Sequence, residues 1–140
     1  MNKTLTSLTT DFEVYEYIKK HLLLQGAKSE IKTHYANGVE VEQGCAYRSD
    51  DDKKCAVGCI IADEFYTYSL EGKACHQQDV LNAVQKSVLN WTVNPILLQE
   101  MQIIHDEKEV DEWHLFLEDM IRHFPNRNNF VQYPEETEIE

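Results

Sequence analysis

The sequence predicts one α+β domain that is mainly helical, with about four to five helices and a small two- to three-stranded antiparallel sheet. Several stretches place apolar residues at the spacing of a helix face, and one stretch alternates polar and apolar residues around Asn37-Gly38. The chain of 140 residues has the usual length of one domain, and no internal repeat is evident. We expect residues 1–9 to be a flexible N-terminus, 10–125 the domain, and 126–140 a polar acidic tail.

The first helix is expected over residues 11–25. Thr10 and Glu13 have the spacing of a capping box, in which a hydroxyl and a carboxylate satisfy exposed backbone N–H groups of the first turn. Gly26 stands where the left-handed residue that ends a helix belongs. Between these signals one face of the helix is apolar, formed by Phe12, Tyr15, Ile18 and Leu22.

The predicted sheet begins with a hairpin of Glu30–Tyr35 and Val39–Gln43, because Asn-Gly between two alternating runs is the strongest short hairpin signal. Two further antiparallel strands are expected over Gly44–Arg48 and Cys55–Ile61, on either side of the turn-rich segment Ser49–Lys54. The buried face of the last strand would consist of Cys55, Val57, Cys59 and Ile61. A sheet this small needs a helix to cover it.

The rest of the domain is expected to be helical, apart from short connections. The proline after Asn94 predicts a helix start, because Asn caps the first turn and proline lacks an N–H that would go unsatisfied. A short connection after this helix makes the last two helices antiparallel neighbours. The expected elements are a helical turn over Ala62–Tyr66, a loop over Leu70–Gly72, and helices over Gln78–Val88, Pro95–His105 and Glu109–Phe124.

The charge balance excludes several classes of partner. The chain has 13 Lys and Arg residues against 25 Asp and Glu residues, a formal net charge of −12. Surfaces that bind nucleic acid directly or dock on anionic membranes use Lys and Arg, so neither partner is expected. No apolar run approaches the roughly 20 residues of a membrane span, and the first residues lack a signal-peptide pattern. We therefore expect a cytoplasmic protein whose four cysteines are thiols.

No catalytic residue, metal site or cofactor is predicted. Cys55 and Cys59 would lie about 13 Å apart along a strand, too far to share a zinc ion. The Asp50–Asp52 run lacks the alternating ligands and the central glycine of a calcium loop. An enzyme remains an alternative, with Cys45 or Cys55 paired with a histidine, or with a metal held by Asp and Glu side chains.

Several short motifs follow one another along the chain. They are CAYR at Cys45–Arg48, KCAVGCII at Lys54–Ile61, LEG at Leu70–Gly72, LQEMQIIHD at Leu98–Asp106, and Trp113. In this order they resemble an uncharacterised family of small proteins of bacteria and their phages, over about residues 12–124. The resemblance implies no activity. The segment Ile31–Glu42, the Asp50–Asp52 turn and the acidic tail depart from the family pattern, so they are candidates for a binding role of this chain.

Eight residues are candidates for a binding site. The resemblance singles out Tyr47, Arg48, Glu71, His105 and Asp106, and the acidic turn adds Asp50, Asp51 and Asp52. Two roles are open for Arg48: holding an anion with both ends of its guanidinium, or forming a structural ion pair with Glu71 that pins the LEG loop. We expect His105 to lie at a helix end, where an imidazolium interacts well with exposed carbonyls, and Asp106 to cap the next helix.

The sequence favours a non-enzymatic, acidic interaction or regulatory protein that binds a basic partner protein, and the resemblance adds an association with phages. A narrower form of this hypothesis is mimicry of nucleic acid, in which carboxylates occupy the phosphate-binding groove of the partner. A further alternative is a small-ligand site between the sheet and the last two helices, lined by Tyr47, Arg48 and Trp113. The sequence carries no signal for an oligomeric state.

Overall fold

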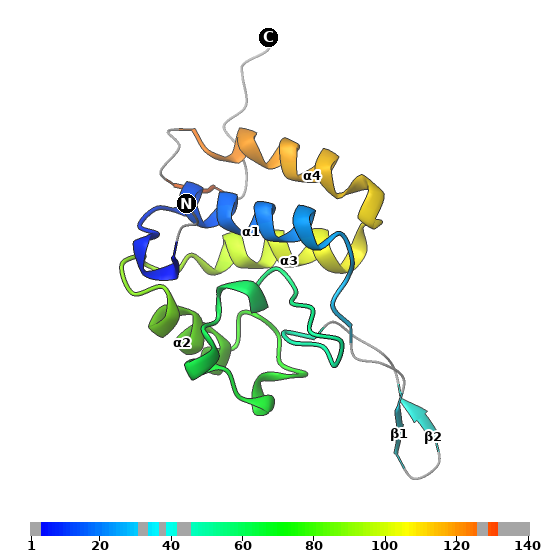
Figure 1. The fold of residues 1–140 in the computed structure, drawn as a ribbon. Coiled ribbons are helices and arrows are strands. Elements are labelled where there is room, and N and C mark those ends of the chain that lie inside the picture. Colours follow the sequence, from blue (N-terminus) through cyan, green and yellow to red (C-terminus); the bar gives the residue numbers. More distant parts are fainter. Residues whose placement is uncertain (1–3, 31–33, 37–38, 42–45, 126–128, 132–140) are drawn as a thin grey trace.

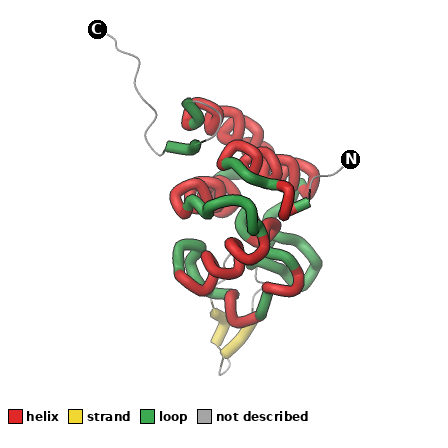
Figure 2. Tube along the Cα trace, turned by 90° about the vertical axis from the view of Figure 1, so that its left-hand side faces the viewer, coloured by secondary structure: helices red, strands yellow, loops and turns green. Residues whose placement is uncertain are grey.

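Four α-helices form most of the regular structure. A computed structural model of the chain describes residues 4–30, 34–36, 39–41, 46–125 and 129–131. The helices are α1 (Asp11–Gln25), α2 (Gln78–Ser87), α3 (Pro95–Glu107) and α4 (Trp113–Asp119). Helices α1, α3 and α4 lie side by side and contact one another, whereas α2 and the turns that precede it form the other part of the molecule (Figures 1 and 2).

Helix α1 confirms the first predicted helix at both ends. The Thr10 hydroxyl accepts a hydrogen bond from the backbone N–H of Glu13 at 3.1 Å. Gly26 is left-handed, with φ of 62°, and its N–H returns to the carbonyl of Leu22. The Glu13 carboxylate accepts from the backbone N–H of Thr9 rather than from that of Thr10. The predicted capping box is therefore present, but one of its two bonds moves back by one residue.

The later helices follow the prediction closely. The Asn94 side chain accepts from the backbone N–H groups of Ile96 and Leu97, and helix α3 then extends two residues past His105. The single helix expected over 109–124 is instead α4, flanked by the 3-10 helices η5 (Val110–Glu112) and η6 (Met120–His123). None of the described helices is long and apolar enough to cross a membrane.

The core lies between α1, α3 and α4 and continues beneath the turns before α2. Its fully buried residues include Val14, Ile18, Leu22, Leu97, Leu98, Met101, Trp113 and Leu117. The hydroxyl of Tyr15, on α1, donates to the carbonyl of Leu117, on α4. Two buried side chains, Leu8 and Phe130, belong to the core although they lie outside the expected range of 10–125.

Asp11 ties two distant segments of the chain to the start of α1. One carboxylate oxygen accepts from the indole N–H of Trp91 at 2.7 Å. The other accepts from the side-chain amide of Asn94 at 2.9 Å and from the backbone N–H of Phe130 at 2.8 Å. Because this carboxylate is buried, the three donors supply the hydrogen bonds that it loses from water. Both segments that flank the last two helices are thereby held against α1.

The predicted α+β class is wrong, because the described helical body contains no sheet. The Asn37-Gly38 hairpin is present only as two short antiparallel strands, β1 (His34–Ala36) and β2 (Val39–Val41), which lie away from the helices (Figure 1). The remainder of the predicted hairpin strands lies outside the described residues. Arg48 and Lys54 form one isolated antiparallel bridge, so the third expected strand is also absent from the described part of Gly44–Arg48.

The segment Cys55–Ile61 is a run of turns and the 3-10 helix η2 (Gly58–Ile60), not a strand. All seven of its residues are buried, so the alternation that a half-exposed strand requires is absent. Its backbone, with that of the adjoining Ala62, bonds within its own turns and to helix side chains instead of to a neighbouring strand. The N–H of Val57 donates to the Gln102 side chain at 3.0 Å, and the N–H of Ala62 donates to the Ser87 hydroxyl at 2.8 Å.

Gly58 allows two buried backbone segments to touch. A Cβ at this position would lie 2.2 Å from the carbonyl oxygen of Tyr47. We predict that Gly58→Ala lowers the free energy of unfolding by about 3 kcal/mol, because the backbone of one segment must move. Gly72→Ala is the matched control: its Cβ would meet no atom within 4 Å, although φ is +83°. It should cost only about 1 kcal/mol. Urea unfolding of the two variants measures this, and equal losses would contradict the close contact.

Candidate functional site

The eight predicted site residues occupy three separate places. Tyr47, Arg48 and Glu71 lie together where residues 46–48 meet the LEG loop. His105 and Asp106 lie in the last turn of α3. Asp50, Asp51 and Asp52 form the exposed turn between Arg48 and Lys54.

The carboxylate of Glu71 holds two backbone N–H groups, and we call this contact the Glu71 clamp. Its two carboxylate oxygens accept from the backbone N–H of Tyr47 at 2.9 Å and of Arg48 at 3.0 Å. The hydroxyl of Tyr66 donates to the same carboxylate at 2.6 Å. Burial, and then this bond to Glu71, raise the pKa of Tyr66, so its hydroxyl stays a donor. Glu71 therefore pins the LEG loop to residues 46–48, as the structural role required.

Arg48 is committed to structural contacts, but its carboxylate partner is not Glu71. One terminal nitrogen lies 2.8 Å from the Asp63 carboxylate, and the other donates to the carbonyl of Ile61 at 2.8 Å. The guanidinium also lies over the ring of Tyr66, 4.6 Å from its centroid. The expected Arg48–Glu71 ion pair is thus replaced by these contacts. Both terminal nitrogens are thus engaged, whereas the buried Nε of Arg48 makes no hydrogen bond with any described residue.

His105 and Asp106 belong to a buried network rather than to a helix cap. The backbone N–H of Ser29 donates to Nε2 of His105 at 2.9 Å, so this nitrogen carries no proton. The proton is on Nδ1, which donates to the Asp106 carboxylate at 2.7 Å. The expected imidazolium is therefore a neutral ring. Asp106 also accepts from the side chain of Gln102 instead of capping the next helix, so that prediction is wrong too.

The Asp50–Asp52 turn is closed by contacts between Asp51 and the side chains of its two flanking residues, Ser49 and Lys53. The Ser49 hydroxyl donates to the Asp51 carboxylate, and Lys53 lies 2.9 Å from the same group. These two contacts, the hydroxyl first, lower the pKa of Asp51 to about 2. Asp52 adopts φ of 67°, and all three carboxylates are exposed. Asp51 therefore keeps its negative charge at any physiological pH.

The two enzyme alternatives receive no support from the described residues. Cys55, Cys59 and Cys75 are buried thiols, and Cys45 lies outside the described residues. Burial raises the pKa of the Cys59 thiol, which donates to the carbonyl of Ala56 and so stays protonated. Within the described ranges, no three His, Cys, Asp or Glu side chains are grouped closely enough to hold a metal ion.

The alternative of a ligand site between a sheet and the last two helices has no support among the described residues. Trp113 is fully buried, and its indole N–H donates to the carbonyl of Lys108. The Tyr47 side chain is also buried, with its hydroxyl donating to the carbonyl of Lys73. These side chains fill the protein interior, and the groove that the structure contains lies elsewhere.

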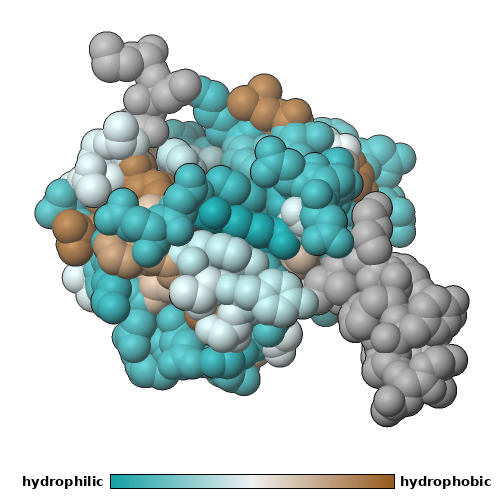
Figure 3. Space-filling model, turned by 60° about the horizontal axis from the view of Figure 1, so that its bottom comes forward, coloured by the Kyte–Doolittle hydropathy of each residue, from teal (hydrophilic) through white to brown (hydrophobic). Residues whose placement is uncertain are grey.

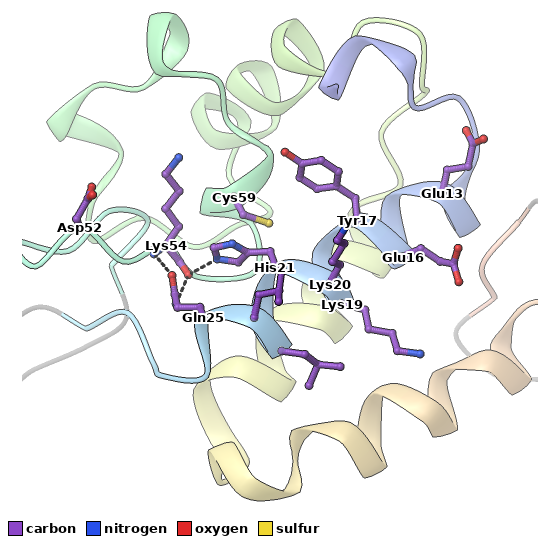
Figure 4. Close-up of a pocket in the computed structure, with 12 residues that line it drawn as sticks. Glu13, Glu16, Tyr17, Lys19, Lys20, His21, Gln25, Asp52, Lys54 and Cys59 are labelled. Carbon is purple, nitrogen blue, oxygen red and sulfur yellow. Dashed lines mark hydrogen bonds between the residues drawn. The ribbon is translucent and has the colours of Figure 1, made fainter. Parts of the chain in front are cut away.

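That groove runs along the exposed side of α1 and has a volume of about 780 Å³. We call it the α1 groove. Tyr17, His21 and Gln25 recur every fourth residue of α1 and line one wall, while Lys54 and Cys59 lie opposite (Figure 4). Figure 4 shows Tyr17, His21, Cys59 and Lys54 around a common gap.

One end of the α1 groove is held by backbone contacts of Lys54. The Gln25 side chain accepts from the N–H of Lys54 at 3.0 Å and donates to its carbonyl at 2.9 Å. Nε2 of His21 also donates to this carbonyl at 2.9 Å. Burial lowers the pKa of His21, and this outweighs the carbonyl, which acts in the opposite direction. The ring is therefore neutral at pH 7, with its proton on Nε2.

The α1 groove was missed by reasoning from the sequence, which used only the apolar face of the first helix. The polar residues Tyr17, His21 and Gln25 share the 3.6-residue period of that face and point to a second, polar contact surface. This signal was available, but the partner segment at Lys54 and Cys59 was expected to be a strand. A strand there does not predict a groove.

Comparisons with known proteins give no family for the chain. No family model, no curated protein and no solved structure matches it.

The Glu71 clamp predicts a specific loss of stability. In Glu71→Gln one acceptor oxygen becomes an N–H₂ group that faces a backbone N–H, so we expect the free energy of unfolding to fall by about 2 kcal/mol. The control is Glu64→Gln, since Glu64 is an exposed carboxylate on the nearby 3-10 helix η3. It should leave stability unchanged within about 0.5 kcal/mol. Equal effects of the two substitutions in urea unfolding would refute the clamp.

His21 predicts a change of stability with pH. Its pKa is lowered on folding from 6.5, so near and below pH 6.5 the unfolded chain binds a proton that the folded chain does not. The contribution of His21 to stability therefore declines as the pH falls from about 7.5 to about 5.5. His21→Gln keeps a donor for the carbonyl of Lys54 but cannot titrate.

The measurement is urea unfolding of the wild type and of His21→Gln at several pH values in that range. The stability advantage of the wild type over the variant should shrink as the pH falls. His76→Gln, at an exposed histidine outside this contact, is the control for replacing a histidine. A His21→Gln difference that stays constant, or grows on acidification, would be evidence against a neutral buried ring.

Proposed function

We propose that the protein is a non-enzymatic interaction protein that binds a basic partner protein through one acidic end. The observation that carries the proposal is the connection between α3 and α4, which we call the α3–α4 turn. Its four carboxylates, Glu107, Glu109, Asp111 and Glu112, are all exposed. Among the described residues, none of them has a cationic partner.

The cations close to the α3–α4 turn are engaged elsewhere. The ammonium of Lys108 lies over the ring of Phe116, 4.5 Å from its centroid. Lys19 pairs with Glu118 at 3.4 Å, farther along α4. The negative charge of the turn is therefore not neutralised internally, so it is available to a partner that carries Lys or Arg side chains.

The Asp50–Asp52 turn lies at the same end of the molecule as the α3–α4 turn (Figure 1). Ser29 bridges the two: its hydroxyl donates to the carbonyl of Lys53 at 3.0 Å, and its N–H donates to His105. The Lys28 ammonium adds a contact to the backbone carbonyl of Asp106 at 3.2 Å. The two runs of carboxylates are far apart in the sequence, but their electrostatic fields add up at one end of the molecule.

Apolar contact is a weaker basis for partner binding. The large apolar side chains that are exposed belong to different elements: Leu23, Leu24, Tyr68, Leu89, Ile103 and Leu115. The face drawn in Figure 3 is mostly hydrophilic, with separate apolar patches. We therefore infer that charge supplies most of the recognition. Such binding is fast and weakens at high salt, because exposed charges are screened beyond roughly 8 Å at physiological ionic strength.

The test is an NMR titration of the protein with a short lysine-rich peptide at physiological salt. Amide shifts should change at the α3–α4 turn and at the Asp50–Asp52 turn. Reversing two charges, in Glu109→Lys with Glu112→Lys, should weaken binding at least about tenfold. The control reverses two exposed charges elsewhere, in Glu16→Lys with Glu64→Lys, and should change affinity less than about twofold.

The two variants have the same net charge, so a difference between them reports position and not overall charge. Equal weakening by both, or shift changes spread evenly over the surface, would overturn the proposal. Adding duplex DNA as a competitor for the peptide tests the narrower form, because a mimic of nucleic acid and DNA itself would compete for the same basic groups.

A further inference from the structure

The α1 groove contains hydrogen-bond donors that nothing in the described part of the protein uses. The ammonium groups of Lys20 and Lys54 and the hydroxyl of Tyr17 make no hydrogen bond or ion pair there. Half of the described lysines do make such a bond: Lys53, for example, contacts a carboxylate at 2.9 Å. Lys20 and Lys54 line the same groove.

The same groove offers acceptors. Because Nε2 of His21 donates to the carbonyl of Lys54, Nδ1 of the neutral ring is an acceptor. The Asp52 carboxylate lies at the rim beside Lys54 (Figure 4), and no described residue contacts its side chain. Glu16 adds a second exposed carboxylate to the lining. These two carboxylates would repel a simple anion. A ligand that carries charges of both signs would be attracted to the donors through its negative group and to the acceptors through its positive group.

The walls of the α1 groove are already in place before any ligand binds. The backbone of Lys54 is bonded on both sides by Gln25 and His21, as described above. Cys59 lies at the floor with its thiol bonded to the carbonyl of Ala56. A volume of about 780 Å³ falls within the range of roughly 300–1,000 Å³ that is usual for small-ligand sites. Preformed walls reduce the ordering that binding requires.

The α1 groove also has an apolar part. The side chain of Leu24 is 77% exposed, and it lines the groove together with the ring of Tyr17. An apolar group of a ligand would cover this leucine and gain about 25 cal/mol for each Å² of apolar surface removed from water. The lining thus has three parts: donors, acceptors and an apolar surface.

We propose that the α1 groove binds a small organic zwitterion of the amino-acid type. The ammonium of Lys54 and the hydroxyl of Tyr17 receive the carboxylate of the ligand. Its amino group donates to Asp52 and to Nδ1 of His21, and its side chain lies on Leu24. This site shares Asp52 with the acidic end but does not depend on the proposed protein partner.

The first experiment is an NMR titration of the whole chain with each of the common amino acids. We expect saturable shift changes at the amides of Tyr17, His21 and Lys54 with at least one of them, strongest for those with apolar side chains. For the best binder, the matching carboxylic acid without the amine and the matching amine without the carboxylate should each bind at least about tenfold more weakly.

The second experiment tests the donors. Lys54→Gln should weaken binding of that amino acid at least about tenfold, and Tyr17→Phe about three- to tenfold. Lys86→Gln is the control, because Lys86 is an exposed lysine of α2 that has no partner among the described residues and lies outside the groove lining. It should change affinity less than about twofold. Neither Lys54→Gln nor Tyr17→Phe should change the melting temperature, since these groups have no internal partner.

Three results would overturn the proposal. The first is that no amino acid produces saturable shifts in the α1 groove. The second is that Lys54→Gln and Lys86→Gln weaken binding equally. The third is that one of the two half-ligands binds as tightly as the whole amino acid, which would show that only one charge is recognised. The charge reversals at Glu109 and Glu112 leave the groove intact, so failure at the acidic end and failure here are distinguishable.

Discussion

Every buried backbone N–H and carbonyl needs a hydrogen-bond partner, and most of this structure follows from how the irregular segment before α2 meets that need. Between Ala46 and Gln77 the described chain has only turns and short 3-10 helices, yet Cys55–Ile61 is entirely buried. A neighbouring strand would ordinarily supply the partners. Here carbonyls of the segment's own turns supply part of them, as where the N–H of Cys59 donates to the carbonyl of Cys55 at 3.0 Å. Side chains supply the others: Gln25, Ser29, Glu71, Ser87 and Gln102.

Two of these side chains also set the geometry of both proposed binding surfaces. Gln25 holds the backbone of Lys54, which forms one end of the α1 groove, and Ser29 holds Lys53 one residue earlier. The Asp50–Asp52 turn is therefore attached to the same few residues as the groove. Asp52 belongs to both surfaces, so a basic partner and a zwitterionic ligand would draw on the same carboxylate. If both proposals hold, occupation of one surface would affect the other through charge, without any change of fold.

The helices could be predicted because their signals are local. Thr10, Gly26 and the Asn94-Pro95 pair mark helix ends within one turn of the residues that they cap. The sheet was predicted wrongly because a short buried apolar run such as Cys55–Ile61 is compatible with a strand as well as with buried turns. Its real partner, Gln102, is 45 residues away from Val57 in the sequence. The α1 groove was missed for the same reason, since Tyr17 and Cys59 meet only in the folded chain.

Ser29 and Ala46 form a clasp at the base of the β1–β2 hairpin. The N–H of Ala46 donates to the carbonyl of Ser29 at 3.0 Å, and the Ser29 hydroxyl donates to the carbonyl of Ala46 at 2.7 Å. The chain therefore leaves and re-enters the helical body at a single point. Closing a longer excursion there adds only about 0.6 kcal/mol for each doubling of its length. The clasp is thus a natural point of insertion, where evolution or an engineer can exchange one appendage for another while the helical body stays the same.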